Sequence, residues 1–276
     1  MLKSLAHPQR IKLIKNICGE AAEDELNSIF EKAMSFLTVD CSFLRVIELF
    51  YLIDNLDNID FEKLERYSIG QRKIKIVKNN NDLNSAIQKI GKNRIIGFDT
   101  EKKPSFKKGA PPNQISIIQI ANDSDCYIFQ VKSLKDVSPL LKVLEDINTI
   151  KIGSGLSEDI ENMLKEFGVR PRSFLDLHQI FKTYLYSEND IGAKKAVAIF
   201  LGKNMKKSKK MSRSNWENKD LSENQIIYAA EDASAVYDVF KYLINNYPFI
   251  INTLPKWFHE KAKIQSCITD LNKGIL

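Results

Sequence analysis

Hydrophobic residues in the first part of the chain recur at intervals of three and four, the spacing of an amphipathic helix. Between residues 26 and 37 this spacing is followed by Leu26, Ile29, Phe30, Ala33, Phe36 and Leu37. The next segment, residues 43–53, is densely apolar and is interrupted by Arg45 and Glu48 at helical spacing. Residues 1–66 are therefore predicted to be helical, with a helix end and loop at the acidic residues 54–60. We find no catalytic constellation in them.

From residue 74 the pattern changes to short apolar runs that are typical of β-strands. Strands are predicted at residues 74–77, 94–101, 114–121, 126–131 and 149–152. The turn-forming residues 122–125 are suited to a hairpin between the third and fourth of these strands. Helices are predicted around residues 82–90, 138–145, 158–167, 194–201 and 223–243, with a short apolar piece at residues 174–180. Antiparallel strands followed by β/α alternation predict an α/β fold, a mixed sheet flanked by helices.

The length of 276 residues suits one large domain or a main domain with an attachment. We expect a helical region at residues 1–70, an α/β domain at residues 71–246 and a helical extension at residues 247–276. With 43% hydrophobic and 28% charged residues the chain is globular in composition, which excludes collagen and wholesale disorder. Its longest apolar run, residues 196–201, is far shorter than the roughly 20 residues of a membrane span.

Cysteine and histidine usage limits the metal chemistry. The four cysteines are scattered without a CxxC pair, which argues against a structural zinc site and a disulfide framework. We therefore expect a reducing intracellular compartment, cytoplasmic or, in a eukaryote, nuclear. The three histidines form no HExxH pattern. Any metal would be bound by oxygen ligands.

The net charge of +6 is unevenly distributed. Residues 1–70 carry 8 Lys and Arg against 12 Asp and Glu, a charge of −4, whereas residues 71–276 carry 33 against 23, a charge of +10. A basic second part suits a polyanionic partner such as nucleic acid. Charge alone is equally explained by a solvated surface that keeps the protein soluble.

Two acids lie at the end of the predicted strand 94–101. Because strand side chains alternate, Asp99 and Glu101 share one face while Phe98 and Thr100 point to the other. Two neighbouring carboxylates repel each other, and a divalent cation between them would remove that cost. The alternative is an exposed strand end with two solvated acids.

A third acid, Asp159, lies near the start of the helix predicted at 158–167, with Ser157 as the expected N-cap. At the edge of the apolar stripe, Asp159 would be able to reach a cleft. Stabilisation of the helix N-terminus is its alternative role.

The last predicted helix has a clear beginning, because Ser222 and Gln225 fit a capping box. Within this helix Tyr228 and Asp232 are four residues apart and share one face. Such a pair forms either a hydrogen bond in the core or a metal ligand beside a tyrosine that holds a water molecule.

The order DxE, D, YxxxD changes the balance between these alternatives. The motifs are FDTE (98–101), KIGSGLSEDI (151–160) and YAAEDA (228–233), with SNWENKDLSENQ (214–225) before the last. Across residues 71–246 the chain resembles the DEDDy 3′-5′ exonucleases of the ribonuclease H-like superfamily, in particular the Werner-syndrome-type exonuclease domain. Ribonuclease D-type enzymes usually have a histidine shortly before the middle aspartate, where this chain has residues 153–155, Gly-Ser-Gly.

This resemblance implies hydrolysis of phosphodiesters at a 3′ end by two cations, Mg²⁺ or Mn²⁺, about 3.5 to 4 Å apart. By the same resemblance Asp99, Glu101 and Asp232 would hold the cation of the nucleophile. Asp99 would also touch the second cation, and Asp159 would act on it through water. Tyr228 would orient the attacking water, and nucleoside 5′-monophosphates would be the products.

Two basic segments are candidates for nucleic-acid contact. Residues 203–213 hold six basic residues in eleven and no acid, and KPSFKKG follows the first motif. The candidate residues are Phe106, Lys107, Lys108, Lys206, Lys207, Lys209, Lys210 and Arg213. A solvated loop is the alternative for residues 203–213. Trp216 is expected to pack on the core.

Three functions remain open from the sequence. The first is an active 3′-5′ exonuclease on DNA or RNA. The second is a weakly active or inactive module that binds nucleic acid or a protein, with residues 1–70 as the part for a protein partner or self-association. The third is a hydrolase of small phosphorylated molecules, which would not shorten a polymer from its end.

Overall fold

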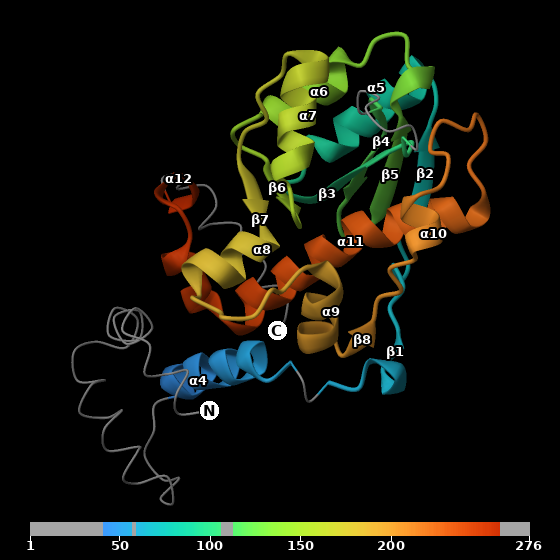
Figure 1. The fold of residues 1–276 in the computed structure, drawn as a ribbon. Coiled ribbons are helices and arrows are strands. Elements are labelled where there is room, and N and C mark those ends of the chain that lie inside the picture. Colours follow the sequence, from blue (N-terminus) through green and yellow to red (C-terminus); the bar gives the residue numbers. More distant parts are fainter. Residues whose placement is uncertain (1–40, 57–58, 106–112, 260–276) are drawn as a thin grey trace, which may run out of the picture. The chain divides into compact units, whose positions relative to one another are not determined.

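The computed structural model describes residues 41–56, 59–105 and 113–259, which form two compact units (Figure 1). The larger unit comprises Phe61–His178 and Gly192–Lys241. The smaller combines Gln179–Ile191 with described residues before Phe61 and after Lys241. Both units are discontinuous in sequence, and the domain boundaries at residues 70 and 246 stay predictions.

The larger unit is built on a mixed six-stranded sheet of order β2-β5-β4-β3-β6-β7. These strands are β2 (Lys73–Val77), β3 (Ile95–Lys102), β4 (Ile115–Ala121), β5 (Asp125–Gln130), β6 (Ile150–Gly153) and β7 (Phe174–Asp176). β4 is antiparallel to both of its neighbours, and the other pairs are parallel. The predicted α/β fold with a mixed sheet is confirmed.

The remaining elements of this unit are mostly helical. They are η2 (Phe61–Lys63), β1 (Glu65–Arg66), α5 (Asn80–Ile90), η3 (Val131–Ser133), α6 (Ser138–Glu145), α7 (Ser157–Phe167), α8 (Leu177–Gln179), α9 (Ala193–Leu201), β8 (Lys203–Asn204), α10 (Lys209–Ser212) and α11 (Glu223–Asn246). α8 and α11 end in the smaller unit.

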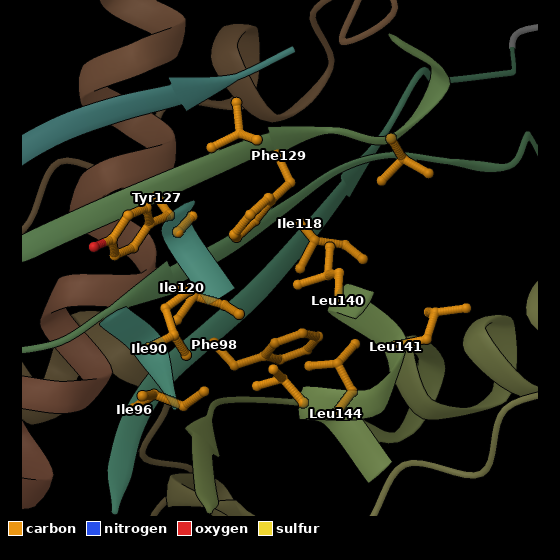
Figure 2. Packing of buried hydrophobic residues seen from close by; sticks show 14 of the residues in the cluster. Ile90, Ile96, Phe98, Ile118, Ile120, Tyr127, Phe129, Leu140, Leu141 and Leu144 are labelled. Atoms are coloured by element: carbon orange, nitrogen blue, oxygen red, sulfur yellow. The ribbon is translucent and has the colours of Figure 1, made fainter. Parts of the chain in front are cut away.

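One face of the sheet packs against α5, α6 and α7. Alternate residues of β3, β4 and β5 point to this side, among them Phe98, Ile118 and Phe129. Figure 2 shows these side chains with Leu140 and Leu144 of α6 in one apolar cluster. Burial of this surface fixes which strand residues face the opposite side.

α11 covers that opposite face (Figure 1). Its start is the predicted capping box: Ser222 N–H donates to Gln225 Oε1 at 3.0 Å, and Gln225 N–H donates to Ser222 Oγ at 3.3 Å. The contact uses small residues, since Ala229 and Ala233 are fully buried against the sheet. Gly97 of β3 lies under α11, and a Cβ there would lie 2.0 Å from the Ala233 carbonyl oxygen.

Two details of the predicted elements are wrong. Residues 65–66 lie in the region predicted to be helical but form β1, which pairs with β8. The helix end predicted at residues 54–60 is confirmed, since the preceding helix ends at Asp54, and the helix predicted at residues 26–37 lies outside the described residues. Ser157 is the first residue of α7 rather than its N-cap. The N–H groups of Gly155 and Leu156 donate to Asp176 of β7 instead, so another strand supplies the acceptors that a capping side chain would offer.

The smaller unit is helical. It holds α4 (Cys41–Asp54), a π-helical turn at Ile180–Tyr184, η5 (Pro248–Thr253) and α12 (Lys256–His259). Asn189 Nδ2 donates to the Ile53 carbonyl at 2.9 Å, and this bond connects the segment Gln179–Ile191 to the end of α4. No helix among the described residues is long and apolar enough to cross a membrane.

Gly97→Ala tests the contact between β3 and α11. The added methyl group would overlap the Ala233 carbonyl at 2.0 Å, so α11 must shift away from β3. We expect a loss of about 1–3 kcal/mol in the free energy of unfolding, measured by urea denaturation. Gly192→Ala is the matched control, because its Cβ would meet only Ser154 Oγ at an ordinary 3.7 Å. Equal stability of the two variants would contradict this packing.

Candidate active site

Three carboxylates converge where β3 passes beneath α11. Asp99 and Glu101 point to the α11 side of the sheet, and Asp232 of α11 points towards them. One oxygen from each of the three lies within 4.8 Å of the others. The alternation predicted for β3 is confirmed, since Phe98 belongs to the cluster on the other face.

Tyr228 lies one helical turn before Asp232 and is buried. Its ring centroid is 6.0 Å from that of Trp216, which is itself buried in the cluster beneath α11. The expected packing of Trp216 on the core is therefore confirmed. Burial, followed by the charges of Asp232 and Glu101, raises the pKa of Tyr228, so its hydroxyl remains protonated and can donate a hydrogen bond.

Asp159 reaches the same area from the other side of β3. It accepts a short hydrogen bond from Thr100 Oγ1, and Thr100 points away from α11. Asp159 is not among the three clustered acids, but with Glu101 it lines a cleft of about 370 Å³. The structure thus places all four predicted acids around the end of β3, three together and one beside them.

The three clustered acids are costly to ionise together. Burial, and then the charge of Asp232, raises the pKa of Asp99. Burial and the neighbouring Asp99 raise the pKa of Glu101 to about 9. Burial also raises the pKa of Asp232. Full ionisation of the three acids would place more negative charge in this part of the described chain than its surroundings neutralise, so the acids retain protons.

The donor set suits a hard divalent cation. All three groups are carboxylates, and Asp232 Oδ2 is buried with no hydrogen-bond partner within residues 41–56, 59–105 and 113–259. Oxygen ligands at this spacing are those that Mg²⁺ and Mn²⁺ accept. A cation would both supply the missing partner and neutralise the repulsion.

The basic residues predicted to contact nucleic acid divide into three groups. Phe106, Lys107 and Lys108 lie outside the described residues. Four others, Lys206, Lys209, Lys210 and Arg213, are exposed, and none pairs with a carboxylate in the part of the chain that the structure describes.

Lys207 forms the third group, and its contact with nucleic acid stays a prediction. Its Nζ donates to Asp232 Oδ1 at 2.5 Å, so the ammonium group lies against the acidic cluster while the side chain remains partly exposed to solvent. Sequence spacing could not reveal this contact, because residues 207 and 232 are brought together only by the fold.

Asp176 at the end of β7 is a residue that the sequence did not single out. Its Oδ1 accepts from Gly155 N–H at 3.0 Å, and its Oδ2 accepts from Leu156 N–H at 2.9 Å. These bonds hold the loop that begins α7, and hence fix where Asp159 lies. The only sequence signal was an acid at the end of a short apolar segment.

Gln119 is another residue that the sequence did not single out. It lies directly opposite Asp99 on β4 and is fully buried, and neither its amide nitrogen nor its oxygen has a hydrogen-bond partner among the described residues. An unpartnered buried amide is expensive. Its place next to Asp99 makes it a potential donor to that carboxylate.

Comparison with known proteins identifies the family. The family model described as 3′-5′ exonuclease matches residues 74–247, which is more than half of the chain. The chain belongs to the 3′-5′ exonuclease family. The matched exonuclease region contains all three carboxylates of the cluster, together with Asp159 and Tyr228. The resemblance drawn from the motifs is thereby confirmed.

Relatives of this exonuclease region occur in larger proteins. Bifunctional 3′-5′ exonuclease/ATP-dependent helicase WRN of Mus musculus is 33% identical over 153 residues, 55% of this chain and 11% of that protein. Ribonuclease D of Desulfotalea psychrophila is 32% identical over 158 residues, 57% of this chain and 41% of that protein. The chain therefore spans less than half the length of either relative.

A solved structure supports the fold of the exonuclease region. Escherichia coli RNase D, described as an exoribonuclease involved in structured RNA processing, superimposes with a TM-score of 0.58 at 23% identity. The superposition covers 71% of this chain and 50% of that one.

The raised pKa of Glu101 predicts a pH dependence of stability in the metal-free protein. Because this pKa rises from 4.5 to about 9 on folding, the folded protein holds a proton that the unfolded chain has lost. Between pH 4.5 and 9 the free energy of unfolding should therefore be highest at the acidic end. It should fall as the pH rises towards 9, by at most about 1.4 kcal/mol per pH unit for one proton.

Urea denaturation in EDTA at pH 6, 7, 8 and 9 measures this slope. Glu101→Gln should flatten it. Glu158→Gln serves as the control. The hydrogen bond from Lys102 lowers the pKa of Glu158, so this carboxyl group does not titrate between pH 6 and 9. An unchanged slope in Glu101→Gln would show that Glu101 is ordinarily ionised.

Asp176→Asn tests the support of the α7 loop. An amide has one acceptor oxygen where the carboxylate has two, so one N–H of the loop loses its partner. We expect a loss of about 1–3 kcal/mol in unfolding free energy. Glu161→Gln, an exposed change on the same helix, should cost nothing measurable. Wild-type stability of Asp176→Asn would refute the role of these bonds.

Proposed function

We propose that the chain is a divalent-metal-dependent 3′-5′ exonuclease that hydrolyses phosphodiester bonds from the 3′ end of DNA or RNA and releases nucleoside 5′-monophosphates. One observation carries this proposal: Asp99, Glu101 and Asp232 converge in the matched exonuclease region, with Tyr228 one helical turn away. A binding module without catalysis would have no need to hold three repelling acids together.

The positions of the three clustered acids support one cation site, and the second site is proposed from the family resemblance. Asp99, Glu101 and Asp232 would hold one cation, and Asp99 with Asp159 would serve a second, each being Mg²⁺ or Mn²⁺. Cations bound there would activate a water molecule and neutralise charge on the phosphate and the departing 3′ oxygen.

The chain's own residues supply position and protonation state. Tyr228 keeps its phenolic proton, because its pKa is raised by burial and by Asp232, and its hydroxyl would orient the attacking water. Thr100 holds the Asp159 carboxylate by its hydroxyl donor. Burial of Asp232 keeps bulk water from its carboxylate, which strengthens electrostatic interactions there.

The end of the strand would enter the cleft beside β3. This cleft of about 370 Å³ is lined by Glu101, Asp159 and Lys103, and by Ser212 at the end of α10. Exposed basic residues lie on and around α10: Lys206, Lys209, Lys210 and Arg213. They favour a polyanionic strand over a small phosphorylated molecule, because only a polymer presents several phosphates at once.

Other aspects of the whole protein stay proposals. The exonuclease would act in a reducing intracellular compartment, since the buried Cys126 is a free thiol and the sequence offers no disulfide framework. Residues 1–70 would serve a protein partner or self-association.

Strand shortening tests the proposed function. DNA and RNA oligonucleotides labelled at the 5′ end are incubated with Mg²⁺, Mn²⁺ or EDTA and resolved on a denaturing gel. The wild-type protein should give a ladder from the 3′ end with metal and none with EDTA. Asp99→Ala should slow the reaction by at least about 10²-fold, because it removes a ligand of both cations.

Asp220→Ala controls for the loss of a carboxylate elsewhere, since the Asp220 side chain is 83% exposed and forms a surface ion pair with Lys78. This variant should match the wild type. A ladder that survives in Asp99→Ala, or binding of oligonucleotides with no ladder in either metal, would overturn the proposed function.

A further inference from the structure

Lys207 is the one cation that the chain itself brings to the acidic cluster among its described residues. Its Nζ donates to Asp232 Oδ1 at 2.5 Å, and it lies 5.7 Å from the centroid of the Tyr228 ring. The ammonium group therefore lies beside Tyr228 and Asp232, two residues to which the proposed mechanism gives a role.

The charges around Lys207 explain why it is held there. Burial opposes a charged ammonium group, but Asp232, Asp99 and Glu101 outweigh this effect and raise the pKa of Lys207. The lysine stays charged and offsets part of the repulsion among the three carboxylates. Its ammonium group lies on Oδ1 of the same carboxylate whose Oδ2 would take the cation, so a divalent cation bound there would be repelled by the lysine's charge.

The lysine has room to leave without unfolding the site. Its side chain is 39% exposed, whereas that of Asp232 is 2% exposed, so the ammonium reaches the cluster from the solvent side. Lys207 lies between β8 and α10, and the four-carbon stem allows the ammonium to move while the backbone stays in place. The solvent side is also where a bound strand would present its phosphates.

We propose that Lys207 is an internal counterion that exchanges partners: it neutralises the carboxylate cluster in the free protein, and it contacts a phosphate of the bound strand once a divalent cation has taken its place. The proposal rests on the proposed exonuclease function. It differs from the family-wide roles of the acids, because it concerns a residue that the motifs do not contain.

Two measurements on Lys207→Met test the exchange, since methionine keeps an unbranched apolar side chain and removes the charge. Mn²⁺ titration of the strand-free protein at pH 8.5, followed by electron paramagnetic resonance, should show binding at least about fivefold tighter than in the wild type. Single-turnover shortening of an oligonucleotide at saturating Mn²⁺ should be at least about tenfold slower.

Two further variants make the comparison specific. Lys207→Arg keeps the charge and should bind Mn²⁺ with nearly wild-type affinity. Lys219→Met removes an exposed lysine outside the cluster and should leave both readouts unchanged. Thermal melting of all variants in EDTA identifies any that fail to fold, and Lys207→Gln replaces Lys207→Met in that case.

The opposite results are equally clear. Mn²⁺ binding that is unchanged or weaker in Lys207→Met would overturn the competition with the cation. Tighter Mn²⁺ binding with unchanged shortening would overturn the contact with phosphate. If the wild type shortens no strand, the proposed function fails, whereas the Mn²⁺ comparison still decides whether Lys207 competes with a cation.

Discussion

The close contact between β3 and α11 determines most of what this site can do. At Gly97 the strand has no side chain, and the Ala233 carbonyl occupies the position that a Cβ would take. Because the two backbones approach so closely, the carboxylate of Asp232 is brought down to those of Asp99 and Glu101. A larger residue at the contact would separate the helix from the strand and the acids from one another.

This contact brings the three acids so close that they repel one another, and the packing of the protein must maintain the arrangement against that repulsion. Three carboxylates lie together, and one buried oxygen, Asp232 Oδ2, has no hydrogen-bond partner in the part of the chain that the structure describes. Folding energy from the apolar clusters on both faces of the sheet maintains the arrangement. The free protein reduces the repulsion through Lys207 and through protons retained on the acids, and a divalent cation would reduce it further.

The sequence predicted the parts of the site that depend on local periodicity. Strand alternation placed Asp99 and Glu101 on one face, and helical spacing placed Tyr228 beside Asp232. Contacts between distant segments could not be predicted in this way. Lys207 read as one of several basic residues in a loop, yet the fold carries it to a residue 25 positions later in the chain.

The same limit applies to the capping of α7. Ser157 had the right type for an N-cap, but the acceptors come from Asp176 on another strand. Stabilisation of a helix end by a distant carboxylate leaves no local pattern, whereas the capping box of α11 lies within four residues and was predicted correctly.

We infer that the fold holds an acidic cluster that is not fully ionised until a cation binds. Calorimetric titration of Mn²⁺ into the metal-free protein at pH 8, in two buffers of different ionisation enthalpy, measures the protons released. We expect release of at least about one proton per protein on binding, and its loss in Asp99→Ala. Binding heats that do not depend on the buffer would contradict it.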